Sequence, residues 1–92
     1  MNTLVLGGAG FLGSNLVRAC LQAGNNAVTV VDSLDPKLHS SLDNLSDISG
    51  DIDFSQGDIR DAQFVRQVVK GHDVVFNCAG QTSHPISGRA RI

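Results

Sequence analysis

The sequence predicts an α/β fold in which a parallel sheet is covered by helices on both faces. Short apolar segments alternate along the chain with segments of helical periodicity, and glycines punctuate the turns between them. The apolar segments lack the alternation of a half-exposed strand, which favours parallel strands that are buried on both faces. The 92 residues allow one domain, and a hydrophobic fraction of 41% with 17% charged residues is typical of a globular chain.

The first half of the chain is predicted to run strand, helix, strand. Residues 3–6 form a short apolar strand that leads into glycine. Residues 11–23 form a helix with one apolar stripe facing the core, and Gly24 ends it in a left-handed conformation. Residues 27–31 form a second strand, which ends at Asp32. The apolar stripe of the helix consists of Leu12, Leu16, Val17, Cys20 and Leu21.

The segment 33–52 is rich in Ser, Asp, Asn and Gly. A bare loop of this length is uncommon inside a compact domain. Because Leu38, Leu42 and Leu45 recur at helical spacing, we predict a short helix after Pro36.

Two further strands and one helix complete the predicted pattern. Residues 52–55 form a weaker third strand, and residues 74–78 form an apolar fourth strand. Between them lies a helix over 62–70, capped by Asp61 and ended by Gly71. Right-handed crossovers then give the strand order 3-2-1-4. The fourth strand would leave a bare apolar edge, so we expect self-association or a partner chain there.

The turn between the first strand and the first helix has the sequence GGAGFLG at residues 7–13. Glycines at its start permit a tight turn, and Gly10 lets a pyrophosphate touch the main chain. Gly13 allows the helix to lie close to the sheet. N–H groups of the first helical turn would hold the phosphate charge. A phosphate-loop NTPase is excluded because Ser14 stands where that motif requires lysine. The turn predicts the first half of a doubly wound, Rossmann-type three-layer fold.

An acidic residue follows in the position that a dinucleotide site requires. Asp32 comes 19 residues after Gly13, at the end of the second predicted strand. A carboxylate there accepts hydrogen bonds from the adenosine ribose and repels a 2′-phosphate. No arginine is near it, and Lys37 is the nearest basic residue. The predicted cofactor is therefore NAD in preference to NADP.

Two later positions fit the same ligand. Asp58 and Ile59 follow the third strand, where we expect them to meet the adenine; the alternative is that Asp58 caps a loop. Ala79 and Gly80 follow the fourth strand at the carboxyl edge, where small residues leave room for ribose and phosphate; the alternative is a plain turn.

Together with GGAGFLG and Asp32, the segments GDIRD at residues 57–61 and NCAGQTSHP at residues 77–85 make the chain resemble a known family. It is the extended short-chain dehydrogenase/reductase family, and the similarity is to its NAD-dependent nucleotide-sugar epimerases and dehydratases. The resemblance covers about residues 2–86 and implies an N-terminal fragment, with residues 87–92 as a tail outside the family. The implied cofactor contacts are Gly7, Gly10, Phe11, Leu12 and Gly13 at the pyrophosphate, Asp32 at the ribose, Asp58 and Ile59 at the adenine, and Ala79, Gly80 and Gln81 near the nicotinamide.

The chemistry of that family depends on a Tyr-x-x-x-Lys pair, and this sequence contains no tyrosine. We therefore expect an NAD-binding N-terminal portion whose catalytic half, with its nucleotide-sugar site, is absent from this chain, and we assign no catalytic residue. Two alternatives remain open: a freestanding nucleotide-binding or redox-sensing module, and a non-functional gene fragment.

Composition limits the other partners. The net charge of −2 without a basic cluster argues against nucleic acid and anionic membranes. No leader peptide and no apolar run long enough for a membrane helix is found. Cys20 and Cys78 are expected to be reduced core residues, which fits a cytoplasmic protein. The three histidines, at positions 39, 72 and 84, are too scattered to predict a metal site.

Overall fold

The computed structural model describes residues 1–24, 27–35 and 40–78. Its four strands form one parallel sheet in the order β3-β2-β1-β4, which confirms the predicted topology. Leu6, the last residue of β1, pairs with Val31 of β2 and with Asn77 of β4. The strands therefore end together at one carboxyl edge. Their bounds are Asn2–Leu6 (β1), Ala27–Asp32 (β2), Asp53–Gln56 (β3) and Val74–Asn77 (β4).

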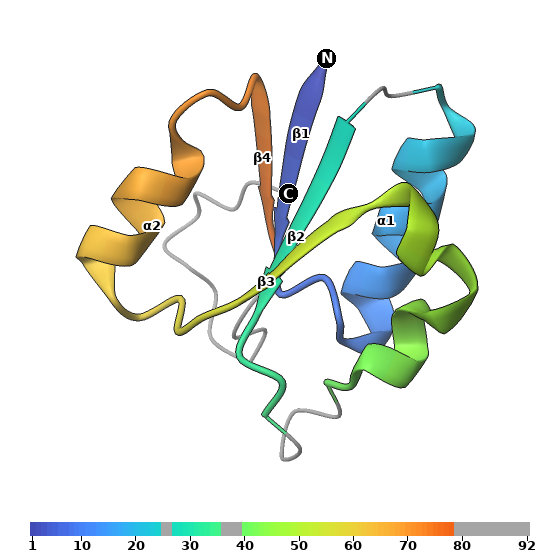
Figure 1. Ribbon diagram of the computed structural model, residues 1–92, viewed down its shortest axis with the longest axis horizontal. Helices are drawn as coiled ribbons and strands as arrows, with labels where there is room; N and C mark the ends of the chain where they lie inside the picture. Colours follow the sequence, from blue (N-terminus) through green and yellow to red (C-terminus); the bar gives the residue numbers. More distant parts are fainter. Residues whose placement is uncertain (25–26, 36–39, 79–92) are drawn as a thin grey trace.

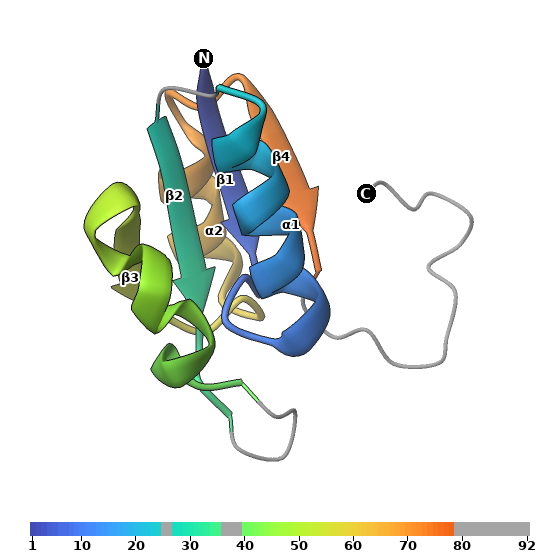
Figure 2. The same ribbon diagram turned by 90° about the vertical axis from the view of Figure 1, so that its right-hand side faces the viewer.

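Helices cover both faces of the sheet, as predicted. The α-helix α1 (Phe11–Gln22) and the 3-10 helix η2 (Leu42–Asp51) lie on one face, and the α-helix α2 (Ala62–Val69) lies on the other (Figure 1). Figure 2 views the sheet from the first face, with α1 and η2 in front and α2 behind. This arrangement makes a three-layer structure with two apolar layers of core.

The two layers of core have different partners. The larger one joins α1 and η2 to the sheet through Val5, Val17, Val30 and Leu45, all with at most 1% of their surface exposed. The smaller one joins α2 to the other face of the sheet, where its half-buried residues pack on strands β1 and β2. Members of this second layer are Leu4, Leu6, Val31, Phe64, Val65, Val68 and Val69.

The predicted cap at Asp61 and the predicted glycine stops of the two α-helices are confirmed. The Asp61 carboxylate accepts the N–H groups of Gln63 and Phe64, which otherwise have no partner in the first turn of α2. Gly24 and Gly71 follow α1 and α2 with positive φ, as the sequence predicts. Seven ends of these strands and α-helices differ from the predicted bounds by one residue, at Asn2, Gln22, Asp32, Asp53, Gln56, Val69 and Asn77.

The short helix predicted after Pro36 is present in part of the segment 33–52, as a 3-10 helix. The described helix begins at Leu42, where the Ser41 hydroxyl accepts the N–H of Asp43, and it is a 3-10 helix. A sequence rich in Ser, Asp and Asn has low α-helical propensity, which fits this tighter form. Leu45 alone is buried in it, while Leu42 is half exposed. Pro36 and Leu38, on which the prediction also rested, lie outside the described residues.

Leu12 was wrongly assigned to the apolar stripe of the first helix. Its side chain is 66% exposed, and that of Phe11 is 71% exposed. The buried residues of α1 begin one position later, at Gly13 and Ser14, and continue at Val17 and Cys20. The first turn of α1 thus presents its large side chains to solvent at the carboxyl edge of the sheet.

Candidate dinucleotide-binding site

The glycine turn connects the end of β1 to the start of α1. Gly7 has φ = +82°, a conformation that side chains disfavour, and its N–H donates to the Val31 carbonyl at 2.6 Å. Gly10 is the N-cap of α1, and its carbonyl accepts the N–H of Ser14 at 2.8 Å. The turn therefore enters the helix at the carboxyl edge of the sheet, as the sequence predicts.

The glycines of the turn serve different contacts. A Cβ on Gly13 would collide with the Gly7 carbonyl and would lie 2.8 Å from the Gly8 Cα. A Cβ on Gly8 would lie 2.6 Å from a Val30 methyl group on β2. Among the described residues, a Cβ on Gly10 would meet the Ser40 Oγ at 3.6 Å and the Gly7 carbonyl at 3.7 Å, and nothing closer. Gly13 thus lets the helix approach the turn, whereas the space beside Gly10 can accept a group from outside.

The start of α1 offers hydrogen-bond donors. Within the described part of the chain, the N–H groups of Phe11, Leu12 and Gly13 have no acceptor. The first turn of the helix also contains no acidic residue. The positive end of the helix dipole adds to these donors, so the turn has the properties of an anion site, and a diphosphate is an anion of suitable size.

Asp32 lies beside the turn, and its carboxylate already accepts hydrogen bonds from main-chain N–H groups. Only 3% of its surface is exposed. One oxygen accepts the N–H of Ala9 at 2.9 Å and lies 3.5 Å from the Ser40 hydroxyl, and the other accepts the N–H of Leu34 at 2.7 Å. The oxygen that accepts the Leu34 N–H has room for a second donor, so a ribose contact is compatible with these bonds. Sequence reasoning missed that Asp32 supports the glycine turn.

Asp58 and Ile59 lie at the same edge, after β3. The Asp58 carboxylate forms an ion pair with Arg60 at 3.1 Å and also accepts the Arg60 main-chain N–H. These hydrogen bonds from Arg60 lower the pKa of Asp58. Ile59 packs against the core layer beneath α2. Their predicted contacts with adenine stay predictions, and Ala79, Gly80 and Gln81 lie outside the described residues.

Two residues at the site were not found from the sequence. The side-chain amide of Asn44, in η2, donates to the Ala9 carbonyl at 2.7 Å. The N–H of Ser41 donates to the same carbonyl at 3.2 Å. The only sequence signal was Ser41 itself, because serine before an apolar residue is a typical N-cap.

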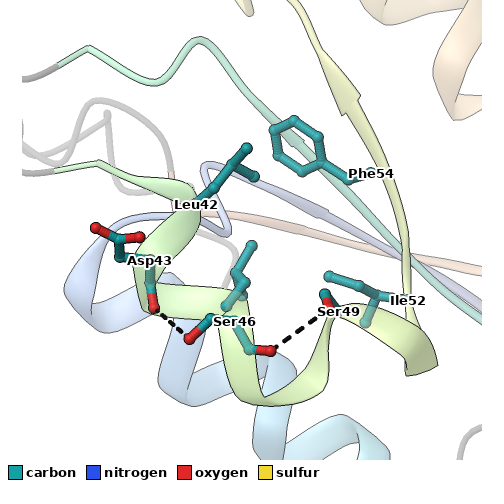
Figure 3. Close-up of a pocket in the computed structure, with 7 residues that line it drawn as sticks. Leu42, Asp43, Ser46, Ser49, Ile52 and Phe54 are labelled. Carbon is teal, nitrogen blue, oxygen red and sulfur yellow. Dashed lines mark hydrogen bonds between the residues drawn. The ribbon is translucent and has the colours of Figure 1, made fainter.

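A pocket of about 310 Å³ lies elsewhere, between η2 and β3 (Figure 3). Its apolar lining includes Leu42, Ile52 and Phe54. The hydroxyls of Ser46 and Ser49 donate to carbonyl groups within η2, so they are already used inside the protein. No residue of the glycine turn lines this pocket, and it brings together no acid–base pair.

His72 and the two cysteines make contacts inside the protein. The ring nitrogens of His72 lie 2.9 Å from the Val68 carbonyl and 3.1 Å from the Thr29 hydroxyl. Cys20 and Cys78 are thiols. Burial is the main cause that raises the pKa of Cys78, and the nearby Cys20 raises it further. A raised pKa disfavours the reactive thiolate and weighs against redox sensing. Among the described residues, no cluster of metal-binding side chains and no helix able to span a membrane is found.

The fold and this turn define the class of protein as a Rossmann-type dinucleotide-binding unit. More particularly, the chain belongs to the NAD dependent epimerase/dehydratase family, whose sequence model matches residues 3–91. The match extends beyond residue 86, and the division of the chain at that point stays a prediction.

Individual relatives agree with this assignment. The chain is 40% identical to the low-salt glycan biosynthesis protein Agl12 of Haloferax volcanii, over 89% of this chain and 26% of that protein. It is 40% identical to a UDP-glucose 4-epimerase of Neisseria gonorrhoeae, over 87% of this chain and 24% of the epimerase. DesIV, a dTDP-glucose 4,6-dehydratase from Streptomyces venezuelae solved with NAD and TYD bound, superposes with a TM-score of 0.77 at 36% identity, covering 89% of this chain and 27% of DesIV. The chain thus spans about a quarter of the length of its relatives.

Proposed function

We propose that this chain binds NAD at the glycine turn and forms the dinucleotide-binding portion of an enzyme that acts on nucleotide sugars. The observation that carries the proposal is the set of donors at Phe11, Leu12 and Gly13, which face no acceptor in the described structure and adjoin the open side of Gly10. A diphosphate satisfies such donors better than water does, because the helix dipole adds to their attraction.

The residues present fit the cofactor in two further respects. Asp32 stands next to the turn, where it can accept from a ribose hydroxyl while keeping its bonds to the main chain. A 2′-phosphate would bring negative charge to this buried carboxylate, so NADP is the poorer ligand. Bound NAD would accept or donate a hydride. The sequence has no tyrosine and only two lysines, so we assign binding and not catalysis to this chain.

We further propose that the intact enzyme acts on a nucleotide sugar and that the protein is cytoplasmic. We also propose that this chain associates with itself or with a partner chain. Relatives named as UDP-glucose and dTDP-glucose enzymes support the substrate class. The two cysteines held as thiols support the location. The position of β4 at the end of the sheet, with its half-buried residues Val74, Val75 and Phe76, supports association at this edge.

The test is calorimetric titration of the 92-residue chain with NAD and NADP, using the variants Gly10→Ala and Gly50→Ala. A methyl group at Gly10 fits the folded chain but occupies the space beside the donors, so NAD affinity should fall at least about tenfold. Gly50 has open space around it and serves as the matched control. If the unsubstituted chain binds no NAD, or if Gly10→Ala binds it as well as Gly50→Ala does, the proposal is wrong.

A further inference from the structure

The peptide groups on both sides of Ala9 are held from outside the glycine turn. Ala9 is fully buried, and its N–H donates to Asp32. Its carbonyl accepts two hydrogen bonds from the other side, one from the Asn44 side chain at 2.7 Å and one from the Ser41 N–H at 3.2 Å. Ala9 thus makes three hydrogen bonds with residues outside the turn.

Asn44 also contacts the helix that follows the turn. Its main-chain carbonyl accepts a hydrogen bond from the Arg18 guanidinium at 2.6 Å, halfway along α1. The same guanidinium forms an ion pair with Asp47, one turn further along η2. Asn44 is thus bonded to the turn before α1 and to α1 itself, and it sets the position of one relative to the other.

The orientation of the Ala9 carbonyl determines that of the next N–H. A trans peptide is planar, and its C=O and N–H point in opposite directions. With the Ala9 carbonyl directed at η2, the Gly10 N–H is directed back across the turn, where it lies 3.4 Å from the Gly7 carbonyl. This geometry places Gly10 as the N-cap, from which the donors at residues 11–13 follow.

From these contacts we infer that Asn44 is a positioning residue of the diphosphate site, acting through the Ala9 peptide and not by touching the ligand. The inference rests on the proposed function, because it concerns affinity for NAD. It places a determinant of cofactor binding in η2, outside the glycine motif. Loss of the Asn44 amide leaves the Ser41 bond in place, so the turn should loosen rather than unfold.

The variant Asn44→Ala tests this inference against Asn15→Ala, which removes an exposed amide from α1. We expect Asn44→Ala to weaken binding of NAD and ADP by about three- to tenfold, the effect of one neutral hydrogen bond. Binding of adenosine, which lacks the diphosphate, should be unchanged. A merely structural role would weaken all three ligands alike. Circular dichroism at the titration temperature verifies that each variant is folded.

A second variant tests whether the effect of Asn44→Ala comes only from lost packing. Asn44→Asp keeps the size of the side chain but places a carboxylate oxygen against the Ala9 carbonyl, so it should weaken NAD binding more than Asn44→Ala does. The inference is overturned if the unsubstituted chain binds NAD while both Asn44 variants bind it as tightly as Asn15→Ala. If the unsubstituted chain binds neither NAD nor ADP, the proposed function fails and the inference fails with it.

Discussion

The carboxylate of Asp32 accepts the main-chain N–H of Ala9 at 2.9 Å across the gap between the end of β2 and the glycine turn. Its second oxygen accepts the N–H of Leu34 at 2.7 Å, and Leu34 has a left-handed backbone with φ = +62°. One buried acid therefore shapes two segments that border the candidate site. Its predicted contact with the ligand and its observed structural contacts can be separated by substitution.

Replacing Asp32 by asparagine should destabilise the fold. Asparagine has one acceptor oxygen, so either the buried N–H of Ala9 or the partly buried N–H of Leu34 loses its partner. Such a loss costs about 1–3 kcal/mol, which urea denaturation would detect as a lower midpoint. The exposed residue Asp51 offers the control Asp51→Asn. Equal midpoints for the two variants would mean that the Asp32 bonds do not hold the turn.

Alanine at position 13 should be much less tolerated than alanine at position 50. A Cβ on Gly13 meets main-chain atoms of Gly7 and Gly8, which cannot rotate away. We expect Gly13→Ala to lower the free energy of unfolding by about 1–3 kcal/mol. A Cβ on Gly50 meets nothing within 4 Å, so Gly50→Ala should be neutral or slightly stabilising. Thermal unfolding, monitored by circular dichroism, compares the stabilities of the two variants. If Gly13→Ala is the more stable variant, the close approach of α1 to the turn is contradicted.

The Arg18–Asp47 pair should make stability depend on acid pH. The hydrogen bond from Arg18 is the main cause that lowers the pKa of Asp47 below its ordinary value of 3.8. A lowered pKa in the folded state adds stability above the ordinary value, and this contribution is lost as the pH falls through the folded pKa. Wild type should therefore exceed Asp47→Asn in stability at about pH 7 and lose this advantage in acid.

Because both partners are partly exposed, added salt should reduce the difference between wild type and Asp47→Asn. Urea denaturation across a pH series measures it. A difference that persists unchanged in acid would rule out the carboxylate as its source.

The outer edge of β4 is the predicted site of self-association. Its sequence VVFN carries no charge, whereas β3 at the other end of the sheet has Asp53, and charge protects an edge strand from pairing. Asn77→Lys adds a charge at an exposed position of β4 and should shift the chain toward monomer in sedimentation velocity. Gln56→Lys at the end of β3 is the matched control and should have no such effect. A wild-type chain that sediments as a monomer would refute association at this edge.

The sequence by itself determined the order of the elements and the topology of the sheet. Continuous apolar runs at β2 and β4 require burial on both faces, and right-handed crossovers then leave one strand order. The glycine string also placed its turn correctly, because only glycine suits the positive φ of Gly7 and the close approach at Gly13. These features depend on local backbone chemistry, which residue type reveals directly.

Tertiary structure decided the contacts of the polar residues and of the residues at the ends of helices and strands. Helical spacing put Leu12 in the core, but burial depends on whether a strand lies opposite, and Leu12 is exposed at the edge of the sheet. The contacts of Asp32 with Ala9 and of Asn44 with the same residue join positions 23 and 35 residues apart. The Asp32 bond depends on how β2 pairs with β1, and the Asn44 bond depends on how η2 packs against the sheet. No periodicity or spacing in the sequence encodes these two contacts.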